Sequence, residues 1–265
     1  MAKTLVAGPW LGEFGWELFM WQARIRYLHL NGNYDKVVCI IRNGHELLYD
    51  DYSPDYAFLN TQGSKNGWRL NEQLPIISPS IKAELDFRYG DYEIYKPNSS
   101  FNFLEQHFVS LKKEHTSELY DIAFHCRSTE KLNTSYRNWE REKWEKIRDT
   151  FSGLKIACVG SKEESMAIEG TNDLRGIPLK DLAVVLSNTK LLMGPSSGTM
   201  HFGSLCECKH IVFTDKSIVF EGKYTNRYRY ETAWNPLHTK AIVLDEEGWR
   251  PPVETVIKCI ERELA

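Results

Sequence analysis

The chain has 265 residues, of which 42% are hydrophobic and 26% are charged, as is typical of a soluble protein. Its formal net charge of -3 provides no global attraction to nucleic acid or to an anionic membrane, although local basic patches stay compatible with it. No run is long and apolar enough to span a bilayer, and residues 1–20 lack a basic segment followed by an apolar one. We therefore expect a cytoplasmic protein.

Six cysteines are scattered along the chain, and Cys206-Glu-Cys208 matches no usual zinc spacing. The pattern predicts buried free thiols and no metal site.

The first elements predict a strand, a glycine loop and a helix. Residues 3–7 form a short apolar run, residues 8–15 are punctuated by glycine, and apolar residues recur at helical spacing from Trp16 to Leu30. A glycine loop after a first strand lets a ligand approach the backbone. Glu13 lies in that loop, where it is a candidate general base. The alternative is a carboxylate that stabilises a helix N-terminus.

The rest of the amino half is less regular. Residues 36–41 read as a buried strand of a parallel sheet and residues 46–52 as a short helix. We expect loops and short strands over 53–100 and an amphipathic helix over 101–113. These elements form an amino lobe, residues 1–115, which we assign to the acceptor and the base.

A second lobe, residues 116–252, alternates strands with helices. Strands are expected at 120–125, 154–159, 190–193, 210–214 and 241–244, and helices at 141–150, after Gly160, from Pro178 and at 253–264. We expect the last helix, within 253–265, to pack back on the amino lobe. This alternation predicts a parallel sheet covered on both faces, with ligands at the carboxyl ends of its strands. Glu13, Arg127, Gly160 and residues 194–201 should then lie on one edge.

The stretch 190–205 predicts a strand, a tight loop and a helix start. Free backbone amides and the helix dipole there suit a phosphate group. Ser196, Ser197 and Thr199 could add hydroxyl donors, and His201 lies in the first turn. The alternative is an ordinary turn with Ser197 as the N-cap.

The carboxyl lobe resembles the heptosyltransferase family, inverting glycosyltransferases of the GT-B kind with two Rossmann-like α/β lobes, parallel sheets and an interlobe cleft. The resemblance rests on Arg137-Asn-Trp139, on Asp173-Leu-Arg-Gly176 and on Gly194-Pro-Ser-Ser-Gly-Thr-Met-His201. It implies donor-diphosphate roles for Arg137 and for a set comprising Ser197, Gly198, Thr199, Met200 and His201. It also implies donor-nucleoside contacts at Gly160 and Ile177.

The amino lobe matches that family through one loop, in which Glu13 follows Gly12 with Glu in place of the commoner Asp. The resemblance implies that this residue is the catalytic base.

Residues 124–131 are similar to a His-x-Arg-x-Thr-Asp-Lys stretch of GDP-fucose-dependent fucosyltransferases. That similarity implies that Arg127 holds the donor diphosphate, with Lys131 as a helper. Guanidinium groups pair with phosphate oxygens through two hydrogen bonds. The alternative for Arg127 is a surface salt bridge.

These residues predict metal-independent, inverting transfer of a sugar from a nucleoside-diphosphate sugar, with no other cofactor. No Asp-x-Asp element for a divalent cation occurs in the chain. The helix start and the basic residues would instead stabilise the leaving diphosphate. A carboxylate would deprotonate the acceptor hydroxyl.

The sequence leaves the acceptor open, with a glycan or a modified DNA base as candidates. Residues 221–230 interleave cations with aromatic residues, so Arg227, Tyr228, Arg229 and, from the amino lobe, Trp16 are candidate acceptor contacts. The alternative is a twisted strand with one polar face. A non-catalytic module that binds a nucleotide or nucleotide sugar remains the second hypothesis, and the sequence does not indicate an oligomeric state.

Overall fold

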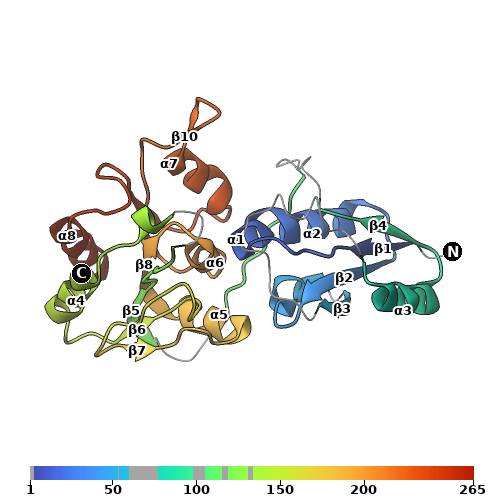
Figure 1. The fold of residues 1–265 in the computed structure, drawn as a ribbon, viewed down its shortest axis with the longest axis horizontal. Helices are drawn as coiled ribbons and strands as arrows, with labels where there is room; N and C mark the ends of the chain where they lie inside the picture. Colours follow the sequence, from blue (N-terminus) through green and yellow to red (C-terminus); the bar gives the residue numbers. More distant parts are fainter. Residues whose placement is uncertain (1–2, 53, 60–76, 98–104, 115–118, 131–133) are drawn as a thin grey trace. The chain divides into compact units, whose positions relative to one another are not determined.

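The computed structural model describes residues 3–52, 54–59, 77–97, 105–114, 119–130 and 134–265. The chain divides into two compact units, residues 1–109 and residues 110–265. Each contains a parallel β-sheet (Figure 1), so the mixed α/β class predicted from the sequence is confirmed.

Four parallel strands form the sheet of the first unit, in the order β3-β2-β1-β4. They are β1 (Thr4–Ala7), β2 (Lys36–Arg42), β3 (Asp55–Leu59) and β4 (Tyr92–Tyr95). β1 and the centre of β2 are buried apolar runs, as expected for strands covered on both faces. Val6, Val38 and Ile40 pack against Leu85 of α3 (Pro79–Tyr89).

The helical segment after β1 consists of three consecutive pieces. α1 (Phe14–Trp16) leads into a π-helical turn, η1 (Glu17–Trp21), and then into α2 (Gln22–Asn31). Two 3₁₀ turns, η2 (Glu46–Leu48) and η3 (Asp50–Tyr52), follow β2. A π-helical turn inside a helix is rare and frequently lies at a functional site.

Six parallel strands form the sheet of the second unit, in the order β12-β9-β8-β5-β6-β7. They are β5 (Tyr120–Phe124), β6 (Ile156–Cys158), β7 (Asn172–Asp173), β8 (Thr189–Pro195), β9 (His210–Phe213) and β12 (Ala241–Leu244). A separate antiparallel hairpin joins β10 (Val219–Phe220) to β11 (Tyr224–Thr225).

Helices cover both faces of this sheet. They are α4 (Arg141–Thr150), α5 (Leu179–Ser187), α6 (Gly198–Leu205) and α8 (Val253–Leu264), and the short η6 (Ser135–Arg137), α7 (Asn226–Arg229) and η7 (Tyr230–Trp234) lie in connections. α4 and α8 lie on one side of the sheet and α5 and α6 on the other (Figure 1). Trp144, Ile147 and Ile260 bury the first face against Phe124. No helix within the described ranges is long and apolar enough to cross a membrane.

The structure keeps most expected elements of the second unit. The helices predicted over 141–150 and 253–264 and the strand over 241–244 have the same bounds as α4, α8 and β12. α8 packs on α4 and β8 of its own unit.

Two expected helices are absent from the described residues. Residues 105–113, part of the expected helix over 101–113, are not helical, because their backbone groups bond elsewhere: the His107 N–H donates to the Ala23 carbonyl at 3.0 Å and the Leu111 N–H to the Leu205 carbonyl at 2.8 Å. Residues 101–104 lie outside the described part. The expected acidic helix after Gly160 is a series of turns that ends where Ser165 bridges to Arg127.

The helix α3 was missed, although its sequence carries helix boundaries. Ser78 is the N-cap, and its hydroxyl accepts a hydrogen bond from the Ile81 N–H at 3.3 Å. Pro79 opens the helix, and Gly90 ends it at a φ of 65°.

Gly194 in β8 lies so close to β5 that a side chain would not fit. A Cβ atom there would be 2.7 Å from the His125 carbonyl oxygen, whereas a Cβ on Gly153 meets nothing within 4 Å. We expect Gly194→Ala to lower the free energy of unfolding by ~1–3 kcal/mol and the melting temperature by several degrees, while Gly153→Ala changes neither. Equal melting temperatures for the two variants would contradict this packing.

Candidate functional site

Parallel strands bring the chain's polar loops to one edge of the second unit. Phe124 at the end of β5 is in register with Cys158 of β6 and with Met193 of β8. Arg127, Gly160 and the loop that precedes α6 therefore follow neighbouring strands. Ligands of parallel sheets bind at this edge.

The start of α6 leaves hydrogen-bond donors without acceptors in the helix. The first i to i−4 bond runs from the His201 N–H to the Ser197 carbonyl at 3.0 Å, so the amides of Gly198, Thr199 and Met200 precede it. Ser197 is the N-cap residue, with extended backbone at φ −164° and ψ 176°, but its side chain caps nothing. Its Oγ is buried and has no partner among the described residues. Such a helix start can bind an anion.

Further buried polar atoms at this edge have no hydrogen-bond partner in the described part of the chain. They include Nε2 of His125, after β5, and Oγ1 of Thr214, after β9. The His125 ring is held by Nδ1, which lies 3.4 Å from the Val159 carbonyl oxygen, and burial lowers its pKa to about 4. Each unsatisfied buried group costs about 1–3 kcal/mol. A polar ligand bound at this edge would remove part of that cost.

Arg137 holds the loop before α6 in place. Its Nη2 donates to the Ser196 carbonyl, and its guanidinium lies 4.3 Å from the centre of the Trp249 ring. On the other side the Ser196 N–H donates to the Phe213 carbonyl at 2.9 Å. The Ser196 backbone is thus fixed from both sides.

Arg127 is buried and bonded to the loop that carries η6. Its Nη1 donates to the Thr134 carbonyl at 2.9 Å and to Oδ1 of Asn138 at 2.5 Å, and its Nη2 donates to the Thr134 hydroxyl at 2.6 Å. The side chain therefore orders the residues before Arg137. Lys131 lies outside the described residues.

His201 and Met200 point into the protein rather than into solvent. Both side chains are buried, and the His201 ring packs against Tyr230 and Trp234 at centroid distances of 5.7 and 5.3 Å. Burial and the nearby Arg137 charge lower the pKa of His201 to about 3, so the ring is neutral at physiological pH.

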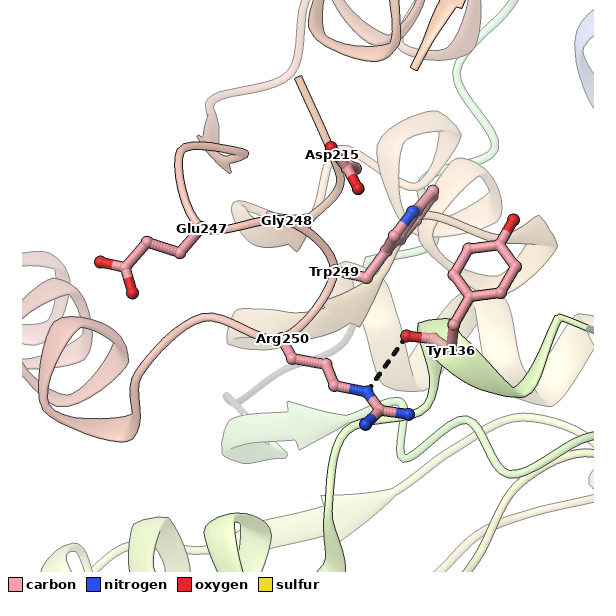
Figure 2. A pocket seen from close by; sticks show the side chains of 6 residues that line it. All are labelled: Tyr136, Asp215, Glu247, Gly248, Trp249 and Arg250. Carbon is pink, nitrogen blue, oxygen red and sulfur yellow. Dashed lines mark hydrogen bonds between the residues drawn. The ribbon is translucent and has the colours of Figure 1, made fainter. Parts of the chain in front are cut away.

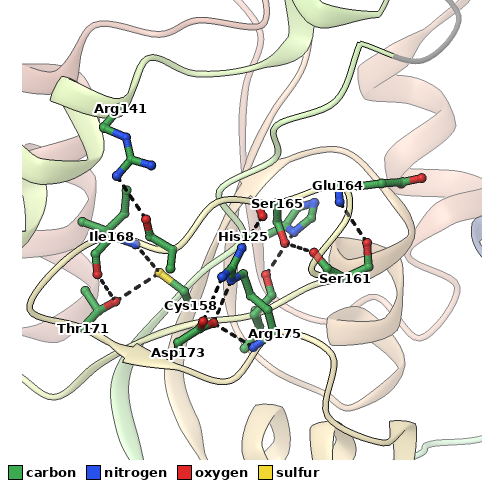
Figure 3. Close-up of polar contacts among 12 residues, drawn as sticks. His125, Arg141, Cys158, Ser161, Glu164, Ser165, Ile168, Thr171, Asp173 and Arg175 are labelled. Carbon is green, nitrogen blue, oxygen red and sulfur yellow. Dashed lines mark hydrogen bonds and ion pairs between the residues drawn. The ribbon is translucent and has the colours of Figure 1, made fainter.

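The two candidate nucleoside contacts belong to adjacent turns. The Gly176 N–H, next to Ile177, donates to the Gly160 carbonyl at 2.8 Å. Asp173 and Arg175 form an ion pair with 2.7 Å between Oδ1 and Nε, and Nη1 of Arg175 donates to the Ser165 carbonyl at 2.5 Å. Figure 3 shows this group beside His125. Arg175 was not predicted as a site residue, although the Asp-Leu-Arg-Gly motif that contains it carries part of the family resemblance.

Glu13 and Glu17 have different surroundings in the first unit. Glu13 is the half-buried N-cap of α1, and its carbonyl accepts the Glu17 N–H at 3.1 Å. Glu17 is fully buried and accepts from Arg42, from the Tyr49 hydroxyl at 3.0 Å and from Nδ1 of His45 at 2.9 Å. Burial alone would raise the pKa of Glu17, but its neighbours His45 and Arg42 outweigh it and lower the pKa to about 2. Sequence reasoning did not identify these partners.

The acceptor candidates of the second unit lie on a helix, not on the alternative strand. Arg227 pairs with Asp245, with Nε 2.9 Å from Oδ2, and Tyr228 is exposed and stacks on Tyr224 at 5.3 Å. The Arg229 guanidinium lies 4.2 Å from the Trp234 ring centre. In the first unit, Trp16 packs on Phe19 at 4.7 Å.

No group of three or more His, Cys, Asp or Glu side chains suited to a metal ion occurs within the residues that the structure covers. All six cysteines are free and buried, as predicted.

We expect Glu17→Gln to destabilise the first unit at neutral pH. The folded pKa of about 2 lies below the ordinary 4.5, so ionised Glu17 contributes about 3 kcal/mol above pH 4.5, and this is lost as the pH falls through 2. The difference in melting temperature between wild type and variant should therefore be large at pH 7 and shrink toward pH 2. Glu46→Gln, which lies outside this network, serves as the control. A pH-independent difference would contradict the ionised state of Glu17.

No protein-family model and no curated protein matches the chain. Solved structures do match over its whole length. The glycosyl transferase family 9 protein from Veillonella parvula DSM 2008 aligns with a TM-score of 0.60 at 16% identity, over 99% of this chain and 97% of the other. The E. coli ADP-heptose lps heptosyltransferase II aligns with a TM-score of 0.58 at 11% identity, over 100% and 98%.

The iron-containing dodecameric heptosyltransferase TibC of enterotoxigenic E. coli H10407, in complex with ADP-D-beta-D-heptose, aligns with a TM-score of 0.56 at 12% identity, over 99% of this chain and 76% of the other. Identities this low establish the fold alone. The chain therefore has the GT-B fold of the heptosyltransferases, as the motifs of its carboxyl lobe predict.

Proposed function

We propose that this protein transfers a glycosyl group from a nucleoside-diphosphate sugar to an acceptor hydroxyl. The observation that carries the proposal is the start of α6, where three amides precede the first helical hydrogen bond and the buried Ser197 hydroxyl has no partner among the described residues. It lies at the carboxyl edge of a parallel sheet in a fold shared with proteins described as ADP-heptose transferases.

The transfer is proposed to need no metal ion. Cleavage at the anomeric carbon leaves negative charge on the diphosphate, and something must stabilise that charge. Preorganised amides and the positive end of the α6 dipole supply a field of the right sign. Arg137 adds a fixed positive charge beside the Ser196 carbonyl. Arg127 acts through the 134–138 loop that it orders.

Glu13 is the proposed general base. Of the two acids near the first glycine loop, Glu17 is already the acceptor for Arg42, His45 and Tyr49, and its low pKa makes it a poor proton acceptor. Glu13 is half-buried and lies at the start of α1. Glu13 would remove the proton of the acceptor hydroxyl as its oxygen attacks the anomeric carbon. Because this attack comes from the face opposite the leaving diphosphate, the anomeric configuration is inverted.

The proposed acceptor is a hydroxyl of a glycan or of a modified DNA base. Exposed Tyr228, stacked on Tyr224, provides an aromatic surface that suits either ring system.

Donor binding can be tested by thermal denaturation with UDP, GDP, ADP, CDP and dTDP, each with magnesium or with a chelator. We expect one nucleotide to raise the melting temperature equally in both conditions, because a ligand at 100 times its Kd stabilises the native state by about 2.7 kcal/mol. Gly198→Pro should keep α6, since proline is favoured at a first helical position. It removes one amide donor, so affinity should fall ~10-fold or more. Absence of any shift, or a shift that chelation abolishes, would contradict the metal-free site.

Glu13→Gln tests the base. We expect turnover of the identified donor to fall by at least ~10²-fold while donor affinity stays within a factor of about two, because the amide keeps the size of the side chain but cannot accept the proton. Product formation by the Glu13→Gln variant at the wild-type rate would favour a different base. If the wild type binds the donor but shows no turnover, the non-catalytic binding module is favoured.

A further inference from the structure

A pocket of about 360 Å³ lies in the second unit, and none of the roles discussed so far uses it. It is formed by the loops that follow β9 and β12 and by η6 (Figure 2). Its lining residues are Tyr136, Asp215, Glu247, Gly248, Trp249 and Arg250.

The lining combines aromatic surface with unused polar atoms. Trp249 is 7% exposed, and its indole N–H is buried without an acceptor in the described residues. Oδ1 of Asp215 accepts from the Ser217 N–H at 2.8 Å and from its hydroxyl at 2.6 Å, while no described residue donates to Oδ2. A Cβ added to Gly248 would lie 3.4 Å from that oxygen, so Gly248 leaves Oδ2 accessible from the pocket side. One donor and one acceptor beside a ring suit a hydroxylated ligand.

The pocket lies next to the loop of the proposed phosphate site. Arg137 joins them, because its Nη2 donates to the Ser196 carbonyl while its guanidinium covers the Trp249 ring at 4.3 Å. Tyr136, the residue before it, meets the same indole at an interplanar angle of 67°.

The order of the strands indicates how a bound nucleoside-diphosphate sugar would be oriented along the sheet edge. Along the sheet edge the order is β12, β9, β8, β5, β6 and β7. The phosphate loop follows β8, the candidate nucleoside contacts Gly160 and Ile177 follow β6 and β7, and the pocket follows β9 and β12 on the opposite side. Neighbouring strands are ~4.8 Å apart, so a nucleoside, its diphosphate and a sugar would extend along this edge in that order.

We propose that this pocket binds the pyranose ring of the donor sugar, with a sugar hydroxyl accepting from the Trp249 indole N–H and another donating to Oδ2 of Asp215. This inference rests on the proposed function. A nucleobase fits less well, because it needs a free parallel ring face, whereas Arg137 covers one face of Trp249 and Tyr136 meets the ring obliquely.

Calorimetric titration of the five nucleoside diphosphates and of their five glucose conjugates tests the proposal on the intact chain. Wild type should bind one glucose conjugate more tightly than the matching diphosphate. Trp249→Phe keeps a ring but removes the N–H, and Asp215→Asn keeps the shape but removes the charge. Each should weaken binding of the conjugate ~3- to 30-fold and leave the affinity for the diphosphate unchanged, which also shows that the variants fold.

Two controls separate the pocket from the phosphate site. Glu246→Gln removes a charge in the same loop outside the lining, and should change neither affinity, whereas Gly198→Pro should weaken both ligands alike. Unchanged conjugate binding in the Trp249 and Asp215 variants, or equal wild-type binding of conjugate and diphosphate, overturns this inference alone. Failure of the wild type to bind any of the ten nucleotides overturns the proposed function together with it.

Discussion

Three backbone amides at the start of α6, those of Gly198, Thr199 and Met200, have no acceptor in the helix, and the side chain of Ser197 does not cap them. The rest of the second unit maintains this arrangement. β9 and Arg137 fix Ser196 from opposite sides, and Arg127 orders the segment that carries Arg137. Amides at a helix start that lack helical acceptors, together with the positive end of the helix dipole, suit an anion. Several elements that hold such donors in place are best explained by a ligand that completes their hydrogen bonds.

The source of positive charge at this edge follows from burial. His125 follows β5, and His201 lies in the first turn of α6. Burial lowers the pKa of both histidines far below neutrality. Both rings are therefore neutral at physiological pH in the protein alone. In the proposed site the positive field then comes from oriented amides and from guanidinium groups, which stay charged. In the proposed site the Ser-Gly-Thr-Met-His motif thus contributes through its backbone, whereas the His201 ring packs against Tyr230 and Trp234.

Local signals predicted much of the fold and little of the side-chain network. β2 and α8 were predicted because a continuous apolar run and an amphipathic repeat are complete within their own segments. The helix expected over 101–113 shows the converse, since backbone bonds to Ala23 and Leu205 decide the conformation of residues 105–113. The pocket could not be predicted either, because Tyr136, Asp215 and Trp249 come from three loops that only the sheet order brings together.

Two carboxylates four residues apart show why spacing alone cannot assign a catalytic role. Glu13 lies in the first glycine loop and Glu17 just after it, and the local pattern does not separate a base from a structural anion. The distinction comes from Arg42, His45 and Tyr49, which β2 and the turns after it bring to Glu17. A carboxylate that is buried and bonded to these donors is a weak base. These bonds engage Glu17 rather than the half-buried Glu13 at the N-cap of α1, so our proposal assigns the stabilising role to Glu17 and the proton-accepting role to Glu13.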